Sequence, residues 1–415
     1  MKIGKYSMGI GDRFNHQAKA QLMAIIDAKE NGIEIAPVWN KSFREHEIIK
    51  SNPLDTRLQA DEAVKALTWD GDYFVDADHV NLNTVDIFIN SCDFFTLDVA
   101  DYIGLEINKD ELEKFCANNS KFLGELELKD LSINLLITEE KIREIGKQYL
   151  FAVKEAGKIY RRILEVKGGN NFIVEVSMDE THSPQTPIEL FFILSAISDE
   201  GIPVQTIAPK FSGRFNKGID YVGDVEKFKN EFELDLAVIK KAIEMFQLSD
   251  NLKLSVHSGS DKFSIYGAIN KAIKKFDTGL HLKTAGTTWL EEIIGLAEAG
   301  DDGLLIAKEI YRRAFDRYDE LCGPYKTVID IDIEKLPNPN EVDTWDKNKY
   351  ANSLRHDQAN ANYNLHFRQL LHVGYKIASE MKEDYIRMLT KHEKIIADNV
   401  QLNIYQRHIK KIFFD

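Results

Sequence analysis

The chain has 415 residues, a formal net charge of −14, 44% hydrophobic residues and 29% charged residues. This composition is typical of a globular protein with a large core, and the negative charge disfavours a nucleic-acid partner, because phosphate binding needs clustered Lys and Arg. Cys92, Cys116 and Cys322 form no CxxC pair, the N-terminal segment MKIGKYSMGIGDR lacks the apolar region of a signal peptide, and no apolar stretch is long enough to span a membrane. We therefore expect a cytoplasmic protein with neither disulfides nor membrane contact.

Short, apolar, β-branched runs alternate with longer helical patterns, which indicates βαβ units and a parallel sheet. About eight such runs occur, the number that a closed (β/α)8 barrel of the TIM type needs. In chain order the predicted strands are residues 6–11, 33–39, 73–77, 94–97, 172–177, 204–208, 252–257 and 280–284. A doubly wound open sheet is the alternative fold, because sequence does not show closure.

Helical patterns fill the intervals between these strands. The clearest are residues 17–31, 187–200 and 225–246, the first two ended by Gly32 and Gly201. The long interval after the fourth strand, residues 101–168, is predicted to be a helical insertion. We therefore expect a barrel domain over residues 1–290, which includes that insertion, and a helical C-terminal extension over residues 291–415 that packs on the barrel.

Strands that are buried on both faces are almost wholly apolar, but several predicted strands here end in polar residues. Period-two alternation places Asp76 and Asp78 on one face of a strand, and His281 and Lys283 on one face of another. In a barrel these faces point inward at the C-terminal mouth, where barrel enzymes carry their chemistry. One such residue is more often a helix cap or a satisfied core group, but six polar strand ends together predict an active site.

Three histidines, His79, His257 and His281, follow or end three different predicted strands. Neutral imidazole binds Zn, Ni, Co, Mn and Fe ions, and three ligands with an open position make a catalytic site. Position alone leaves open whether these rings bind a metal or donate hydrogen bonds. Asp78 and His79 are adjacent and would point apart in a regular strand, so both reach one site only if the chain bends there.

Asp78 and Glu175 are the best candidates for an acid and a base, because they lie on separate strands and could flank a substrate. Asp76, Asp98, Asp179 and Glu180 are rivals, and each could instead cap a following helix. Four cations also lie at strand ends, and each could hold a substrate carboxylate or neutralise a protein carboxylate. These cations are Arg13, Lys210, Lys262 and Lys283.

The chain resembles the tagaturonate epimerase family, also described as tagaturonate/fructuronate epimerases, and the resemblance spans nearly the whole sequence. The most specific matches are HSGSDKF at 257–263 and HLKTAGT at 281–287. The others are GIGDR at 9–13, DADHV at 76–80, EVSMDET at 175–181, KGIDYVGD at 217–224 and RQLLHV at 368–373. Carried over by motif, the resemblance implies that Asp78 is the proton acceptor and Glu175 the proton donor. It also implies that His79, His257 and His281 bind one divalent metal ion.

The resemblance implies an isomerase that interconverts D-tagaturonate and D-fructuronate, which differ at carbon 4 while the ketone is at carbon 2. The carbon 4 hydrogen is not alpha to the ketone, so a retro-aldol route is expected. A metal cation (Mn, Co, Ni, Zn or Fe) would act as Lewis acid. Arg13, Lys210 or Lys283 would bind the substrate carboxylate. The alternatives are a metal-dependent isomerase or aldolase acting on another acidic sugar, a metal-free hydrolase and a sugar-binding protein. Homo-oligomerisation stays open.

Overall fold

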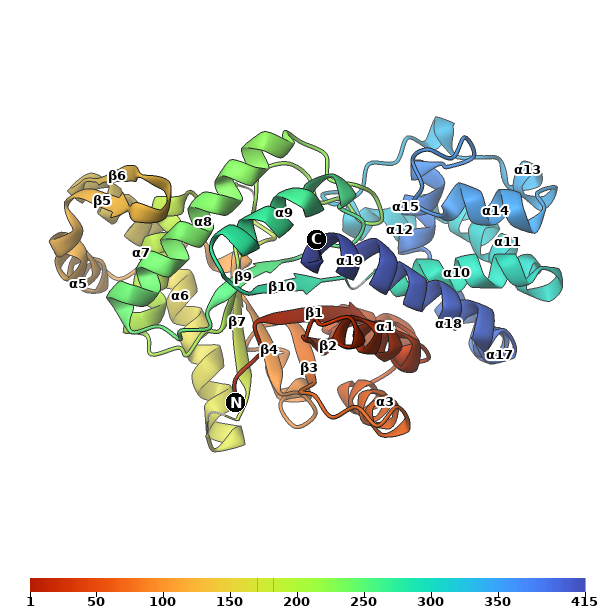
Figure 1. Cartoon of the computed structure of the whole chain (residues 1–415), viewed down its shortest axis with the longest axis horizontal. Helices are drawn as coiled ribbons and strands as arrows, with labels where there is room; N and C mark the ends of the chain where they lie inside the picture. Colours follow the sequence, from red (N-terminus) through yellow and green to blue (C-terminus); the bar gives the residue numbers. More distant parts are fainter. Residues whose placement is uncertain (170, 182, 285, 415) are drawn as a thin grey trace.

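A computed structural model describes residues 1–169, 171–181, 183–284 and 286–414. Its eight parallel strands close into a barrel in the order β1-β10-β9-β8-β7-β4-β3-β2 (Figure 1). The barrel strands are β1 (Tyr6–Gly11), β2 (Ile35–Ser42), β3 (Phe74–Val80), β4 (Phe94–Asp98), β7 (Ile173–Ser177), β8 (Thr206–Ala208), β9 (Lys253–Val256) and β10 (Leu280–Lys283). The predicted barrel is thus confirmed, and closure between β1 and β10 excludes the open sheet.

The helices between these strands begin and end where local sequence signals place them. Ser42, Asn52 and Thr186 each form a capping box at a helix start, and two of these helices have Pro at the first position. Gly32 and Gly201 follow helices with positive φ. The barrel helices are α1 (Ala18–Glu30), α2 (Phe43–Ile49), α3 (Pro53–Ala66), α4 (Val85–Phe88), α7 (Pro187–Asp199), α8 (Val225–Phe246), α9 (Phe263–Lys275) and α10 (Thr287–Ala299).

The insertion after β4 is only partly helical. It contains α5 (Lys109–Asn119) and the long α6 (Glu139–Lys167), as predicted. Between them lies an antiparallel hairpin, β5 (Gly124–Leu128) and β6 (Ile133–Ile137), which the sequence analysis did not predict. Alternating burial at Leu126 and Leu128 is the period-two signal of this hairpin. Figure 1 shows the hairpin and α5 at the opposite end of the molecule from the C-terminal helices.

The C-terminal part is helical, as predicted, and packs on the barrel. Helix α18 contacts α1 and α10, and α19 contacts α9. Residue 290, the predicted domain boundary, lies inside α10, and the division there stays a prediction. The helices are α11 (Asp301–Asp316), α12 (Tyr318–Cys322), α13 (Pro339–Asp343), α14 (Lys347–Leu354), α15 (Leu365–Val373), α16 (Tyr375–Met381), α17 (Glu383–Lys391), α18 (Glu393–Leu402) and α19 (Lys410–Phe413). Among the described residues, no helix combines the length and apolarity needed to cross a membrane.

Asp235, a buried carboxyl on α8, gives the fold a pH dependence. Burial and the neighbouring Glu231 raise the pKa of Asp235 well above its usual range. The folded chain therefore holds a proton that the unfolded chain releases above about pH 4, so this group lowers stability as pH rises from there through its folded pKa. Asp235→Asn is expected to raise the free energy of unfolding, and to raise it more at pH 8 than at pH 5. The gain should grow by about 1.4 kcal/mol for each pH unit between the unfolded and the folded pKa of Asp235.

Urea titrations at both pH values measure this effect. The control is Glu244→Gln, which replaces an exposed carboxylate on the same helix and is expected to change stability little. An equal gain at pH 5 and pH 8 for the Asp235 variant would show that the carboxyl is not protonated in the fold.

Candidate active site

A bend at the end of β3 brings two adjacent side chains to one site. His79 has φ +55°, in the left-handed region, and the register between β3 and β4 shifts between Ala77 and Val80. As a result Asp78 and His79 both face the barrel mouth, and His79 Nδ1 lies 2.8 Å from Asp78 Oδ1. The bend that the sequence required for Asp78 and His79 to share a site is therefore present.

His79, Asp179 and His257 form a cluster with metal-ligand spacing at this mouth. One ligand atom of each lies within 4.8 Å of those of the other two. Asp179 Oδ1 lies 3.1 Å from His257 Nδ1 and 3.4 Å from His79 Nε2, and accepts a 2.6 Å hydrogen bond from Ser177. Two imidazoles and a carboxylate suit Zn, Co, Ni, Mn or Fe ions, so these residues fit a divalent cation.

The raised pKa values of His79 and His257 also support a cation site. Burial lowers the pKa of His257, but Asp179 and Glu175 outweigh it and raise the pKa to about 9. Burial likewise opposes Asp78 and Asp179 at His79, and the carboxylates raise its pKa well above its usual range. The neighbouring carboxylates therefore favour positive charge on the two rings. A bound divalent cation would supply that charge in place of the ring protons.

His281, the third predicted imidazole ligand, lies apart from this cluster. On β10 its Nδ1 is 2.9 Å from Ser7 Oγ, and its ring centroid is 5.2 Å from that of Phe94. Its Nε2 is buried and, within the described residues, has no hydrogen-bond partner. Burial lowers the pKa of His281 to about 3, so the ring is neutral. It lies two residues before Lys283 on the same inward face, deeper in the barrel.

Lys283 is surrounded by three buried carboxylates inside the barrel. Its Nζ lies 2.8 Å from Asp76 Oδ2, 2.8 Å from Asp78 Oδ1 and 3.2 Å from Glu175 Oε1. Thr96 accepts a hydrogen bond from Lys283, and its hydroxyl contacts Asp76 and Glu175. Lys283 therefore neutralises protein carboxylates, the second of the two roles left open for it.

These carboxylates differ in protonation although they share one cation. Burial raises the pKa of Asp78 and Glu175, but Lys283 and the histidines beside them hold both well below their usual range. Burial prevails at Asp76, with help from its two carboxylate neighbours, and raises its pKa to about 7. Near neutral pH, Asp78 and Glu175 are therefore ionised, whereas Asp76 is protonated in part of the molecules.

A cavity of about 370 Å³ opens over the cluster. Asp78, His79, Asp179, His257 and Lys283 line it, but Glu175 does not. Glu175 is fully buried, and its Oε1 lies 2.7 Å from His257 Nε2. The predicted proton donor thus lies one side chain behind the cavity wall, in contact with two groups that face the cavity.

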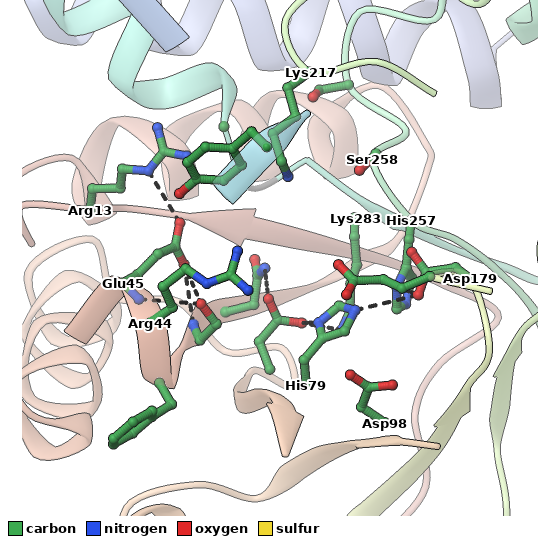
Figure 2. Close-up of a pocket in the computed structure, with 18 of the residues that line it drawn as sticks. Arg13, Arg44, Glu45, His79, Asp98, Asp179, Lys217, His257, Ser258 and Lys283 are labelled. Atoms are coloured by element: carbon green, nitrogen blue, oxygen red, sulfur yellow. Dashed lines mark hydrogen bonds and ion pairs between the residues drawn. The ribbon is translucent and has the colours of Figure 1, made fainter. Parts of the chain in front are cut away.

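The other predicted cations are already engaged. Arg13 lines the cavity and pairs with Glu45 at 3.1 Å (Figure 2), and its guanidinium lies 4.1 Å over the ring of Tyr375. Lys210 lies outside this cavity, in a neighbouring one of about 520 Å³, and donates to the backbone carbonyl of Asp179 at 3.4 Å. Lys262 donates to three backbone carbonyls and holds the loop after β9.

The C-terminal extension supports the same loop through a buried ion pair. Arg368 Nη2, on α15, lies 2.7 Å from Asp261 Oδ2, and neither side chain is exposed to solvent. Arg368 also donates to the backbone carbonyls of Gly218 and Leu354, and the Asp261 N–H donates to His408 Nε2 at 3.0 Å. Asp261 has φ +62°, so these contacts fix a turn only four residues after His257.

From the sequence, Asp179 is only a rival to Asp78 and Glu175 as acid or base, and no pattern predicts the Asp261–Arg368 pair. A signal for Asp179 existed, because period two places it on the same strand face as Glu175. Asp261 and Arg368 lie in two matched motifs, but a pair 107 residues apart leaves no local pattern. Of the matched segment 281–287, residue 285 lies outside the described residues.

Comparisons with known proteins agree over most of the chain. Residues 1–412 match the sequence model of a family described as tagaturonate epimerase. The tagaturonate/fructuronate epimerase of Thermotoga maritima is 29% identical over 421 residues, which cover 97% of this chain and 80% of that protein.

Solved structures show the same fold. The native crystal structure of the fructuronate-tagaturonate epimerase from Cohnella laeviribosi superposes with a TM-score of 0.82 at 20% identity, covering 99% of this chain and 82% of that one. A crystal structure of that enzyme with two glycerols gives 0.82 at 21% identity, covering 100% and 83%. At these identities the similarity shows a shared fold and no more.

Proposed function

Because the chain belongs to the tagaturonate epimerase family, and so to the isomerases, we propose that it interconverts D-tagaturonate and D-fructuronate by inverting carbon 4 with one bound divalent metal ion. The observation that carries this proposal is the adjacency of two sites in one cavity. The cluster of His79, Asp179 and His257 lies beside the charge network of Asp78 and Lys283.

The proposed metal ligands are His79 and His257, together with a third group. Asp179 is the third member of the cluster, and the predicted alternative is His281, whose Nε2 is buried without a partner among the described residues. When bound, the cation would act as a Lewis acid that polarises the substrate ketone. The chain's own residues would orient the sugar and move its protons.

In the retro-aldol route, Asp78 takes the proton of the carbon 4 hydroxyl, and the bond between carbons 3 and 4 breaks. Asp78 suits this role because it is ionised and lines the cavity. After the aldehyde fragment rotates and re-adds, the new alkoxide needs a proton. Asp78 holds the proton that it took, and the Lys283 ammonium contacts both Asp78 and Glu175 and faces the cavity. Lys283 is proposed to pass this proton to the ionised Glu175, which then donates it to the new alkoxide by way of Lys283.

The function is tested by incubating the metal-loaded protein with D-tagaturonate and following the sugar by NMR. Formation of D-fructuronate, abolished by EDTA and restored by Mn, Co, Ni or Zn, is expected. An aldose product would favour a sugar isomerase, and stable fragments would favour an aldolase. Formation of D-fructuronate that persists in EDTA would contradict the metal requirement, whereas a metal-free hydrolase would leave D-tagaturonate unchanged and cleave a uronate glycoside in EDTA.

The carbon 4 hydrogen separates the two chemical routes. In a retro-aldol reaction this hydrogen stays on the aldehyde carbon, so deuterium placed there is retained through turnover. Loss of the deuterium to solvent would instead require direct proton exchange at carbon 4.

Single substitutions are expected to distinguish the two ligand sets. Asp179→Asn should lower the metal content of the purified protein by about 10-fold or more, because it removes one of three ligands, while His281→Asn should leave it nearly unchanged. Elemental analysis measures both, with Asp98→Asn as a control that alters a carboxylate lining the same cavity outside the cluster. Loss of metal only in the His281 variant would assign that histidine as the third ligand.

A further inference from the structure

The cluster of His79, Asp179 and His257 is called the metal-type cluster below. The cavity above it continues into the neighbouring cavity that Lys210 lines. The two share seven lining residues, among them Asp179, His257 and Ser258, and so form two lobes of one cleft. Carboxylates and imidazoles dominate the first lobe near His79. The second lobe is basic, because five Arg or Lys side chains line it against only two carboxylates.

Most of the cleft's cations are bound to groups of the protein itself. Arg13 pairs with Glu45, Lys283 with the buried carboxylates, and Arg214 with Asp330 at 3.2 Å. Within the described ranges, the side chains of Arg44 and Lys217 have no hydrogen bond and no carboxylate partner, although both line both lobes. Two cations without counterions at the junction of the lobes are therefore available to a ligand.

An aromatic ring holds these two cations on one wall. Arg44 Cζ and Lys217 Nζ each lie 5.8 Å from the ring centroid of Tyr325. Arg44 comes from the start of α2 and Lys217 from the segment after β8, so three distant parts of the chain meet here. Ring faces attract cations but do not neutralise them as carboxylates do, so the positive charge remains available to an anion.

Figure 2 shows the arrangement of these groups around the cavity. His79, Asp179 and His257 lie together on one side, Arg44 lies on the other, and Lys217 reaches in from above. A keto-uronate has a matching polarity, with a ketone toward one end and a carboxylate at the other. If the ketone end lies at the metal-type cluster, the carboxylate end points away from it.

We infer that Arg44 and Lys217 form the subsite for the substrate carboxylate, an inference that rests on the proposed function. The subsite replaces Lys283 in that role, because Lys283 already balances three protein carboxylates. It also accounts for how a chain with a net charge of −14 binds an anion. Two uncompensated cations create a local positive potential within an unfavourable overall field.

Arg44→Met and Lys217→Met test the subsite. Each is expected to raise both the calorimetric Kd and the KM for the keto-uronate about 10- to 100-fold, the value of one charge-assisted hydrogen bond, with kcat nearly unchanged. Binding of the neutral ketohexose, which has a hydroxymethyl group in place of the carboxylate, should not change. Lys229→Met is the matched control, because it removes one positive charge from the outside of α8.

The outcomes separate the subsite from the function. If the wild type interconverts the uronates but the Arg44 and Lys217 variants behave like Lys229→Met, the subsite is wrong and the function stands. Equal weakening toward the neutral sugar would also overturn it. If the wild type does not interconvert the uronates, the proposed function fails, and calorimetry still decides the subsite by whether Lys217→Met removes a preference for the uronate over the neutral sugar.

Discussion

Glu175→Gln is expected to lower kcat about 100-fold or more, the usual size of a general acid–base contribution. The substitution keeps the shape of the side chain but removes its charge. It therefore weakens the contact with Lys283 Nζ, 3.2 Å away, through which the proton is proposed to pass, and it changes the partner of His257 Nε2, 2.7 Å away. KM should change much less, because Glu175 does not line the cavity.

The measurement is steady-state kinetics of the metal-loaded variant beside elemental analysis. Metal content is expected to stay near that of the wild type, because Glu175 lies outside the cluster of candidate ligands. Glu144→Gln, an exposed glutamate on α6, provides the control and should retain full activity. Wild-type kcat in the Glu175 variant would exclude any role for this carboxylate in proton transfer.

Arg368→Met is expected to lower the free energy of unfolding by about 3–5 kcal/mol, because it leaves the Asp261 carboxylate buried without its partner. Both groups are fully buried, and Arg368 holds the pKa of Asp261 well below its usual range against the effect of burial. The same change should lower activity, since Asp261 fixes the turn that follows His257. Urea unfolding and kcat/KM measure the two effects.

Two further variants show whether the loss comes from the unpaired charge. Arg368→Met combined with Asp261→Asn removes both charges and should recover part of the stability. Arg317→Met breaks two ion pairs at the surface, with Glu320 and Glu380, where Arg317 is 31% exposed, and should cost less than about 1 kcal/mol for each pair. If Arg317→Met and Arg368→Met lower the free energy of unfolding by similar amounts, burial does not make the loss of the Asp261 partner more costly.

The barrel was predictable because its signals are local. Each buried strand is a short apolar run ended by polar residues, and capping boxes at Ser42 and Thr186 mark helix starts. The hairpin β5–β6 was missed because its burial pattern is weak: β5 buries only Leu126 and Leu128 between exposed glutamates, and β6 buries only Ile137. That weak alternation lies between two strong helical patterns, which dominate the segment.

The site was predictable as a location and less so as a set of roles. Strand ends placed Asp78, His79 and His257 together correctly, because the C-terminal ends of parallel strands share one mouth. The depth of each side chain was not visible in the sequence. His281 lies two positions before Lys283 on β10, and Glu175 lies behind His257. These differences in depth arise only when the strands stagger around a closed barrel.

The contacts of Asp261 also set the order in which the enzyme becomes complete during synthesis. The partners that fix this turn, Arg368 and His408, follow it by 107 and 147 residues. A nascent chain that has already produced all eight barrel strands therefore still lacks these two supports of the turn, although Lys262 already holds the same loop. We therefore expect a chain released before its last helices to carry every predicted catalytic residue but to lack the two contacts that fix the turn after His257.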